Sequence, residues 1–342
     1  MKTFVILLAL IGSFANAAPY QLADAQHTFH ANGRALDSRI YYPTEDSGPQ
    51  HVLAANPVFA GIPSRINAPV AQGRFPLVIL SHGSGGNNAS QAWLAKALVE
   101  QGIIVAAANH PGSTTGNSLP AQSARLWLQT EDMSALIGAM LDDARWSQRI
   151  DANAIGVIGH SKGGYSAIAL VGGRLDLRQF IHGCHRAPHS ANCQFYTQAK
   201  VELRQLSAQR FNHDYQDRRV RFAIALDPGM APYLLPASLG SLSAPLLIVE
   251  AQRYLATADG LGGASLAKYA GRHPITSVQI PDSSHFDFLP LCTPRAKTVL
   301  AQEGESFICD STTAQRAAVH QQTIATVLQF IHPWLTRTAK NR

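Results

Sequence analysis

The sequence has 342 residues, of which 46% are hydrophobic and 15% are charged, and this composition excludes a disordered or a fibrous chain. The formal net charge is +6, but the basic residues are scattered apart from Arg218, Arg219 and Arg221, which is more typical of a solvated face than of a site for anionic partners. We therefore expect a globular protein that does not bind nucleic acid.

The first residues predict export. Lys2 precedes an apolar run at 4–11, and Ala15-Asn16-Ala17 follows with the small side chains of a cleavage site, so residues 1–17 have the pattern of a signal peptide. The apolar run is shorter than the ~20 residues that cross a bilayer, and no later stretch is long and uncharged enough. We expect residues 18–342 to form one domain, periplasmic or extracellular, with no stable membrane insertion.

The rest of the chain alternates short apolar runs with helical patterns. The predicted strands are 76–81, 104–109, 154–159, 222–227, 245–250 and 275–280. The predicted helices are 89–101, 132–143, 161–171 and 313–336, the last interrupted at Pro333. This alternation predicts an α/β fold with a mainly parallel central sheet and helices on both faces. Residues 38–42 predict a strand of an antiparallel edge.

Residues 174–219 break this alternation where a short connection is normal. The segment contains the first two cysteines and a helical pattern near 200–210. We interpret it as a cap-like insertion over the carboxyl ends of the strands, where it would shape a pocket. An excursion without a functional role is the alternative.

The chain has four cysteines, Cys184, Cys193, Cys292 and Cys309. An even number in an exported chain predicts disulfides, and we expect the local pairs Cys184–Cys193 and Cys292–Cys309 among three possible connectivities. The alternative is a zinc cluster, because imidazole and thiolate both bind zinc. Its members would be His182, Cys184, His185, His189 and Cys193. An oxidising compartment favours the disulfide, and the spacing matches no common zinc motif.

The central motif is Gly159-His160-Ser161-Lys162-Gly163-Gly164, which directly follows a predicted strand and directly precedes a helical run. A serine on a sharp strand-to-helix turn needs small residues two positions to either side, because larger side chains would collide with the adjoining backbone. It also lies at a helix amino terminus, which favours developing negative charge. The motif predicts Ser161 as a nucleophile.

A serine hydroxyl is too weakly acidic to attack unaided, so it needs a histidine base oriented by a carboxylate. On this kind of sheet the chain order is serine, acid, histidine. His285 fits that order best, because it follows the strand at 275–280 through a short loop that can reach back to the serine. A surface histidine without a role is the alternative.

Three carboxylates lie at or just beyond strand ends in the right interval. Asp227 ends one strand and is followed by Pro228-Gly229, a sharp turn that would direct its side chain across the top of the sheet. Glu250 ends the next strand, and Asp259 lies in the loop beyond it. The residues favour Asp227, and Asp259 remains a rival.

Acyl transfer also needs hydrogen-bond donors for the oxyanion, usually the amide after the nucleophile and one from the loop after an earlier strand. The first is the amide of Lys162. The second candidate is the amide of Ser84, in the glycine-rich segment Ser81-His82-Gly83-Ser84-Gly85-Gly86, with a merely flexible turn as the alternative. We assign the Lys162 side chain no catalytic role.

Five ordered motifs resemble the bacterial predicted dienelactone hydrolases, a group of α/β-hydrolases similar to plasma platelet-activating-factor acetylhydrolase. They are 81–86, Asn109-His110-Pro111-Gly112, 159–164, Ala225-Leu226-Asp227-Pro228 and Ser284-His285-Phe286-Asp287-Phe288. The resemblance covers about 76–289 and implies that Asp227 completes the triad with Ser161 and His285. True dienelactone hydrolases use a cysteine nucleophile, whereas this chain has Ser161, so the family name does not give the activity.

Together these residues predict a secreted serine hydrolase that cleaves carboxylic esters through an acyl-enzyme. Its substrate would be a small-molecule or lipid-like ester, and no metal or organic cofactor is needed. The same machinery would also suit a lactone or a polyester, with the segment 174–219 deciding how open the cleft is. The alternatives from other classes are a non-catalytic binding protein on a hydrolase scaffold and a metal-dependent function of the 182–193 cluster.

Overall fold

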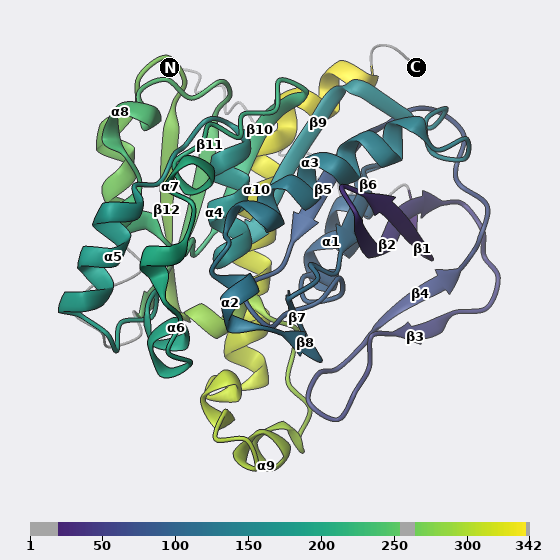
Figure 1. Cartoon of the computed structure of the whole chain (residues 1–342). Helices are drawn as coiled ribbons and strands as arrows, with labels where there is room; N and C mark the ends of the chain where they lie inside the picture. The colour runs from purple at the N-terminus through teal and green to yellow at the C-terminus, as the bar shows by residue number, and fades with distance from the viewer. Residues whose placement is uncertain (1–19, 254–263, 340–342) are drawn as a thin grey trace, which may run out of the picture.

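The computed structural model describes residues 20–253 and 264–339 (Figure 1). In that part of the chain ten strands form one sheet in the order β12-β11-β10-β9-β5-β6-β2-β1-β4-β3. Six neighbouring strands, from β12 to β6, run parallel. Their bounds are β5 Phe75–Ser81, β6 Ile104–Ala108, β9 Ile150–His160, β10 Val220–Leu226, β11 Leu246–Arg253 and β12 Ile275–Ser284. The six predicted strands are these six, so the mainly parallel sheet is confirmed.

Helices cover both faces of this sheet. Successive strand side chains point to opposite faces, and because these side chains are apolar, each face needs helices to bury it. Leu77 and Ile79 of β5 pack in one core with α3 (Trp127–Asp142) and α4 (Lys162–Leu170). Val78 and Leu80 pack in a second core with α1 (Ala92–Glu100) and α10 (Thr313–Ala339). Figure 1 shows α3 and α4 in front of the sheet and α10, in yellow, behind it. This is the α/β-hydrolase fold expected from the sequence.

The antiparallel part of the sheet is larger than expected. The predicted strand at 38–42 is part of β2 (Arg34–Thr44), which pairs antiparallel with both β6 and β1 (Gln21–Ala31). The expected strand of an antiparallel edge is therefore confirmed, although β2 is not the outermost strand. Beyond β1 lie β4 (Ile62–Ile66) and β3 (His51–Leu53).

The segment 174–219 consists of short helices rather than one long one. They are α5 Leu177–Arg186, α6 Gln194–Gln198, the 3-10 helix Leu203–Gln205 and α7 Ala208–Phe211. The helix expected near 200–210 was wrong, because the chain is extended at Leu206 and Ser207. The segment does reach the carboxyl ends of the strands: the Asn192 side chain accepts a hydrogen bond of 2.8 Å from the amide of Met230, just after β10.

The C-terminal helix was expected over 313–336 with an interruption at Pro333, but α10 runs through Pro333 as one helix to Ala339. A proline inside a helix removes one backbone hydrogen bond. Packing of residues before and after Pro333 offsets the lost bond, because Ile331 is buried and the ring of Trp334 lies 4.8 Å from Phe222 of the sheet. Neither α10 nor any other helix within the described residues is long and apolar enough to cross a membrane.

Short elements complete the connections. The hairpin β7 (Ser113–Thr114) and β8 (Asn117–Ser118) and the helical turn α2 (Pro120–Ser123) follow β6. The turn α8 (Pro236–Leu239) follows β10 and a 3-10 turn at Ala231–Tyr233, and a 3-10 helix at Ala264–Tyr269 precedes β12. After β12 come a 3-10 turn at His285–Phe288, α9 (Ala296–Ala301) and a 3-10 turn at Ser306–Cys309.

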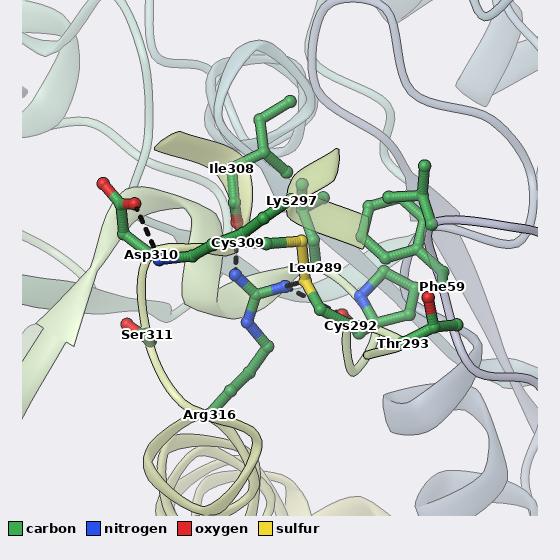
Figure 2. Close-up of a disulfide and its surroundings, with 12 residues drawn as sticks. Phe59, Leu289, Cys292, Thr293, Lys297, Ile308, Cys309, Asp310, Ser311 and Arg316 are labelled. Atoms are coloured by element: carbon green, nitrogen blue, oxygen red, sulfur yellow. Dashed lines mark hydrogen bonds and ion pairs between the residues drawn. A yellow bond between two sulfur atoms is a disulfide. The ribbon is translucent and has the colours of Figure 1, made fainter. Parts of the chain in front are cut away.

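Two disulfides join the expected pairs. Cys184–Cys193 links the end of α5 to the start of α6. Cys292–Cys309 joins the segment after His285 to the turn before α10, and Figure 2 shows the guanidinium of Arg316 beside it. Because Cys184 and Cys193 bond to each other, the alternative zinc cluster lacks its thiolates.

Candidate active site

Ser161 lies on the sharp turn that the sequence predicted, between the last residue of β9 and the first of α4. Its φ of 55° and ψ of −120° are unusual for a residue with a side chain, and such a conformation costs on the order of 1–3 kcal/mol. The flanking glycines make the turn possible. A Cβ on Gly159 would lie 2.0 Å from the Gly163 oxygen, and one on Gly163 would lie 2.3 Å from the Ser81 oxygen.

His285 and Asp227 meet at the same end of the sheet. Asp227 directly follows β10, and His285 directly follows β12. The Nδ1 of His285 lies 2.5 Å from Oδ2 of Asp227, and both side chains are buried. Because Nδ1–H keeps its proton and donates a hydrogen bond to the carboxylate, Nε2 is the ring nitrogen that can accept a proton.

The backbone brings Ser161 next to this pair. The Ser161 amide donates to the Leu226 oxygen at 3.0 Å, one residue before Asp227. The ring of His160, one residue before Ser161, lies 4.6 Å from the ring of His285. The Ser161 hydroxyl makes no hydrogen bond to His285 within the described residues. In sites without a substrate such bonds are often formed only on binding.

The rival carboxylates are differently placed. Glu250, in β11, is fully buried and accepts a hydrogen bond of 3.4 Å from the hydroxyl of Ser277. Asp259 falls in 254–263, outside the described residues. Asp227 is therefore the carboxylate that the structure joins to His285. Its second oxygen accepts a bond of 3.0 Å from the Ala251 amide, which fixes the carboxylate from both sides.

The glycine-rich loop after β5 passes close to Ser161. A Cβ on Gly83 would lie 2.9 Å from the Cβ of Ser161, so the residue directly before Ser84 lies beside Ser161. Lys162 is the first residue of α4, where the amides have no partner inside the helix. The two predicted oxyanion donors therefore belong to segments that flank Ser161.

The Lys162 side chain is a feature that the sequence did not reveal. It is 4% exposed, and its ammonium donates to Ser123 O at 2.7 Å, Ser123 Oγ at 2.9 Å and Ser113 Oγ at 3.0 Å. Burial lowers the pKa of Lys162 to about 7, although the charge of Asp132 opposes that shift. No sequence signal indicated this, because the two serines lie 49 and 39 residues upstream.

A buried polar network lies beneath the loop after β5. His110, from the family-like motif 109–112, bonds through Nε2 to Ser81 Oγ at 2.9 Å and through Nδ1 to Asp132 at 3.0 Å. Arg34 also pairs with Asp132, at 2.6 Å. Burial raises the pKa of Asp132, but the bonds from His110 and Arg34 outweigh it and hold the pKa below its usual range. Ser81, His110 and Asp132 are buried, whereas Arg34 remains partly exposed.

The network supports the loop through Gln129 and His82. The Gln129 amide donates to Ser81 Oγ at 2.9 Å and to the His82 oxygen at 2.6 Å. The His82 ring donates to Gly83 O at 2.7 Å and accepts from the His110 amide at 3.3 Å. Burial lowers the pKa of His82 well below its usual range, so the ring is neutral.

The turn that carries His285 is held from two sides. His160 donates from Nε2 to the His285 oxygen at 3.0 Å. On the other side, Asp287 accepts from the amide and hydroxyl of Ser284, at 2.7 and 2.9 Å. The Asp287 amide in turn donates to the Ser284 side chain, which completes a capping box with the bond from the Ser284 amide. Asp287 also pairs with the buried Arg316 at 3.3 Å, which ties the turn to α10.

Comparison with known proteins agrees with this architecture. A model of the prolyl oligopeptidase family (Peptidase_S9) matches residues 88–221, a segment that contains Ser161. No curated protein matches the chain. Among solved structures, a ferulic acid esterase from Streptomyces cinnamoneus is 17% identical, with 92% of each chain covered and a TM-score of 0.61. A structure from work on two esterases of Rhizomucor miehei is 14% identical, covering 90% of this chain and 88% of that one, with a TM-score of 0.44, too low to support a conclusion.

The esterase structure shows the α/β-hydrolase fold, and its low identity carries nothing beyond the fold. The prolyl oligopeptidase match covers less than half of the chain but includes the Ser161 turn, which supports a hydrolase of the serine α/β type. Neither comparison names the dienelactone hydrolases or the acetylhydrolases, so that resemblance stays a prediction.

Proposed function

We propose that this protein hydrolyses carboxylic esters, with Ser161 as nucleophile, His285 as base and Asp227 as the orienting acid. The observation that carries the proposal is the 2.5 Å bond between His285 Nδ1 and Asp227, formed by two strand-end loops beside the strained turn of Ser161. A surface histidine or a turn-capping aspartate has no reason to form this buried pair at that point of the sheet.

The reaction would follow two steps. His285 Nε2 takes the proton of Ser161 as its oxygen attacks the ester carbonyl, and the alcohol leaves with that proton. Water, deprotonated by the same histidine, then cleaves the acyl-enzyme and releases the acid. The amides of Ser84 and Lys162 would hold the oxyanion in both steps, and such a donor contributes about 10²- to 10³-fold in rate. The chemistry needs no metal or organic cofactor.

The substrate class is the finer part of the proposal. We favour a small-molecule or lipid-like ester, with a lactone or a polyester as alternatives that the same residues would serve. The prolyl oligopeptidase match makes a peptide bond the second candidate. Export is also proposed here: the signal peptide predicted at 1–17 lies outside the described residues, and the two disulfides support an oxidising compartment.

The test is labelling with a fluorophosphonate, combined with turnover of short p-nitrophenyl esters, lactones and peptide p-nitroanilides. We expect the wild type to be labelled and to hydrolyse the esters, and Ser161→Ala to lose both. Ser166→Ala is the matched control, because it removes a nearby serine hydroxyl that is buried in α4 and donates to the Lys162 oxygen at 3.3 Å. A folded wild type that is neither labelled nor active would favour a binding protein, and faster p-nitroanilide turnover would favour a peptidase.

A further inference from the structure

We propose that the Lys162 side chain is a positioning residue that holds the two oxyanion donors in register. Its own backbone amide is one proposed donor, and its ammonium is bonded to the segment that supports the loop of the other donor. The inference rests on the proposed function for its catalytic consequence, but the positioning itself is a property of the fold.

The first part of the connection is the ammonium and its three acceptors. Ser113 and Ser123 supply all of them, from β7 and from the end of α2. The two hydroxyls also lie 3.3 Å from each other. Lys162 therefore closes the base of the excursion 113–123, which contains the hairpin β7–β8 and α2. Ser113 and Ser123 are the two ends of that excursion, and both are buried.

The second part joins this excursion to the loop after β5. The Gly85 amide donates to Ser113 O at 3.0 Å, and the Thr115 amide donates to Gly86 O at 2.8 Å. The hydroxyls of Thr114 and Thr115 donate to Gly86 O and Gly85 O, at 2.8 and 2.7 Å. These four bonds begin at the residue directly after Ser84. A displacement of Ser113 would thus move the Ser84 amide relative to the Lys162 amide.

The charge around Lys162 argues against a simple stabilising role. The charged groups that act on it are Asp132, which favours the cation, and Arg34, which opposes it, while the neighbouring rings of His82 and His110 have lowered pKa values. Its direct acceptors are two hydroxyls and one carbonyl, none of them charged. A buried cation without an anion in contact is costly for the folded state. Its placement is therefore better explained by what it holds in place.

The same anchor reaches the insertion. The hydroxyl of Tyr196, in α6, donates to Ser123 O at 3.5 Å, the same oxygen that accepts from Lys162. The insertion, the excursion 113–123 and the residue after the nucleophile therefore meet at one carbonyl. This shared carbonyl therefore fixes the position of the insertion relative to the two proposed oxyanion donors.

The test compares Lys162→Met with the wild type. We expect kcat for the p-nitrophenyl ester to fall by about 10- to 100-fold, as for a small displacement of a catalytic donor, with KM within about threefold. The melting temperature should change by less than about 4 °C or rise, because the buried charge is removed. Lys96→Met is the matched control, since its amine pairs with Glu100 on the surface of α1, and it should leave kcat unchanged.

Two further readouts separate positioning from a general loss of structure. Hydrogen exchange of the amides at 83–87 and 113–115 should become faster in Lys162→Met and stay as in the wild type in Lys96→Met, whether or not the protein is an esterase. On a Ser113→Ala background, Lys162→Met should lower kcat less than it does alone. Unchanged exchange would overturn the inference, as would a fall in kcat no larger than the control's in an active enzyme. If the wild type is inactive and unlabelled, but exchange at 83–87 and 113–115 is still faster in Lys162→Met, the proposed function is refuted and the positioning role is supported.

Discussion

The buried pair of Asp287 and Arg316 gives a prediction whose size follows from the structure. Arg316 is 1% exposed and donates to Asp287 at 3.3 Å, to Pro290 O at 2.9 Å and to Ile308 O. It also lies 2.9 Å from Cys292 Sγ, beside the disulfide (Figure 2). Arg316→Met would leave a buried carboxylate and two carbonyls without this donor. Breaking a buried ion pair in this way costs about 3–5 kcal/mol.

That loss is measurable as a shift of melting temperature. One kcal/mol corresponds to about 2 °C in a large domain, so Arg316→Met should melt about 6–10 °C below the wild type. The matched control is Lys297→Met, because Lys297 pairs with Asp310 at 3.4 Å in the same region but both side chains are more than half exposed. The control should shift by less than about 2 °C. Equal shifts in the two variants would refute the reasoning that burial makes the difference.

The pair should also affect activity, because Asp287 caps the turn of His285. In the folded fraction of Arg316→Met, well below its melting temperature, kcat should fall while phosphonate labelling persists at a lower rate. A wild-type kcat in a variant that melts 6 °C lower would show that the turn is held without the arginine.

Asp227→Asn should lower kcat by about 10⁴-fold with little change in melting temperature, because asparagine retains the shape but favours the wrong histidine tautomer. Ester kinetics and thermal unfolding test this prediction, and activity within tenfold of the wild type would contradict it. Because the pKa of Lys162 is lowered in the folded protein, the unfolded chain binds more protons between about pH 7 and pH 10. The wild type should therefore gain stability over Lys162→Met by about 1.4 kcal/mol per pH unit in that window, measured by urea unfolding, and a constant difference would refute it. Replacing both Cys184 and Cys193 by serine should cost about 2–3 kcal/mol, the loop-closure term for a separation of 9 residues, without abolishing labelling of Ser161.

Much of the fold followed from periodicity, and the reasons for the misses are physical. Five of the six parallel strands contain apolar runs that are buried on both faces, so their pattern is visible in the chain, whereas the outermost strand β12 is partly exposed. The residues of strand β1 change from buried to exposed along its length, and its sequence QLADAQHTFHA gives no comparable run. The interruption expected within α10 was wrong, because a proline predicts a break, whereas contacts with Phe222 across the core decide the outcome.

The same distinction separates the parts of the candidate site. Ser161 belongs to a local motif, and His285 and Asp227 follow from strand ends and chain order, so the sequence indicated all three before the structure brought them together. The Lys162 anchor and the Asp287–Arg316 pair join residues 29 or more positions apart. No local pattern reports such a contact, because it depends on how loops from different strands meet.

The backbone of Asp227 has a consequence for how this chain can change over generations of mutation. Its φ is 42°, a left-handed value that residues other than glycine rarely adopt, with aspartate and asparagine the main exceptions. Glutamate carries the same acid group but lacks the short side chain that tolerates this conformation. Asparagine fits this backbone but has no charge, and glutamate has the charge but does not fit, so under the proposed function aspartate alone meets both demands. Under the proposed function, mutation of Asp227 therefore gives an inactive enzyme or a destabilised fold, and no other residue can replace the acid.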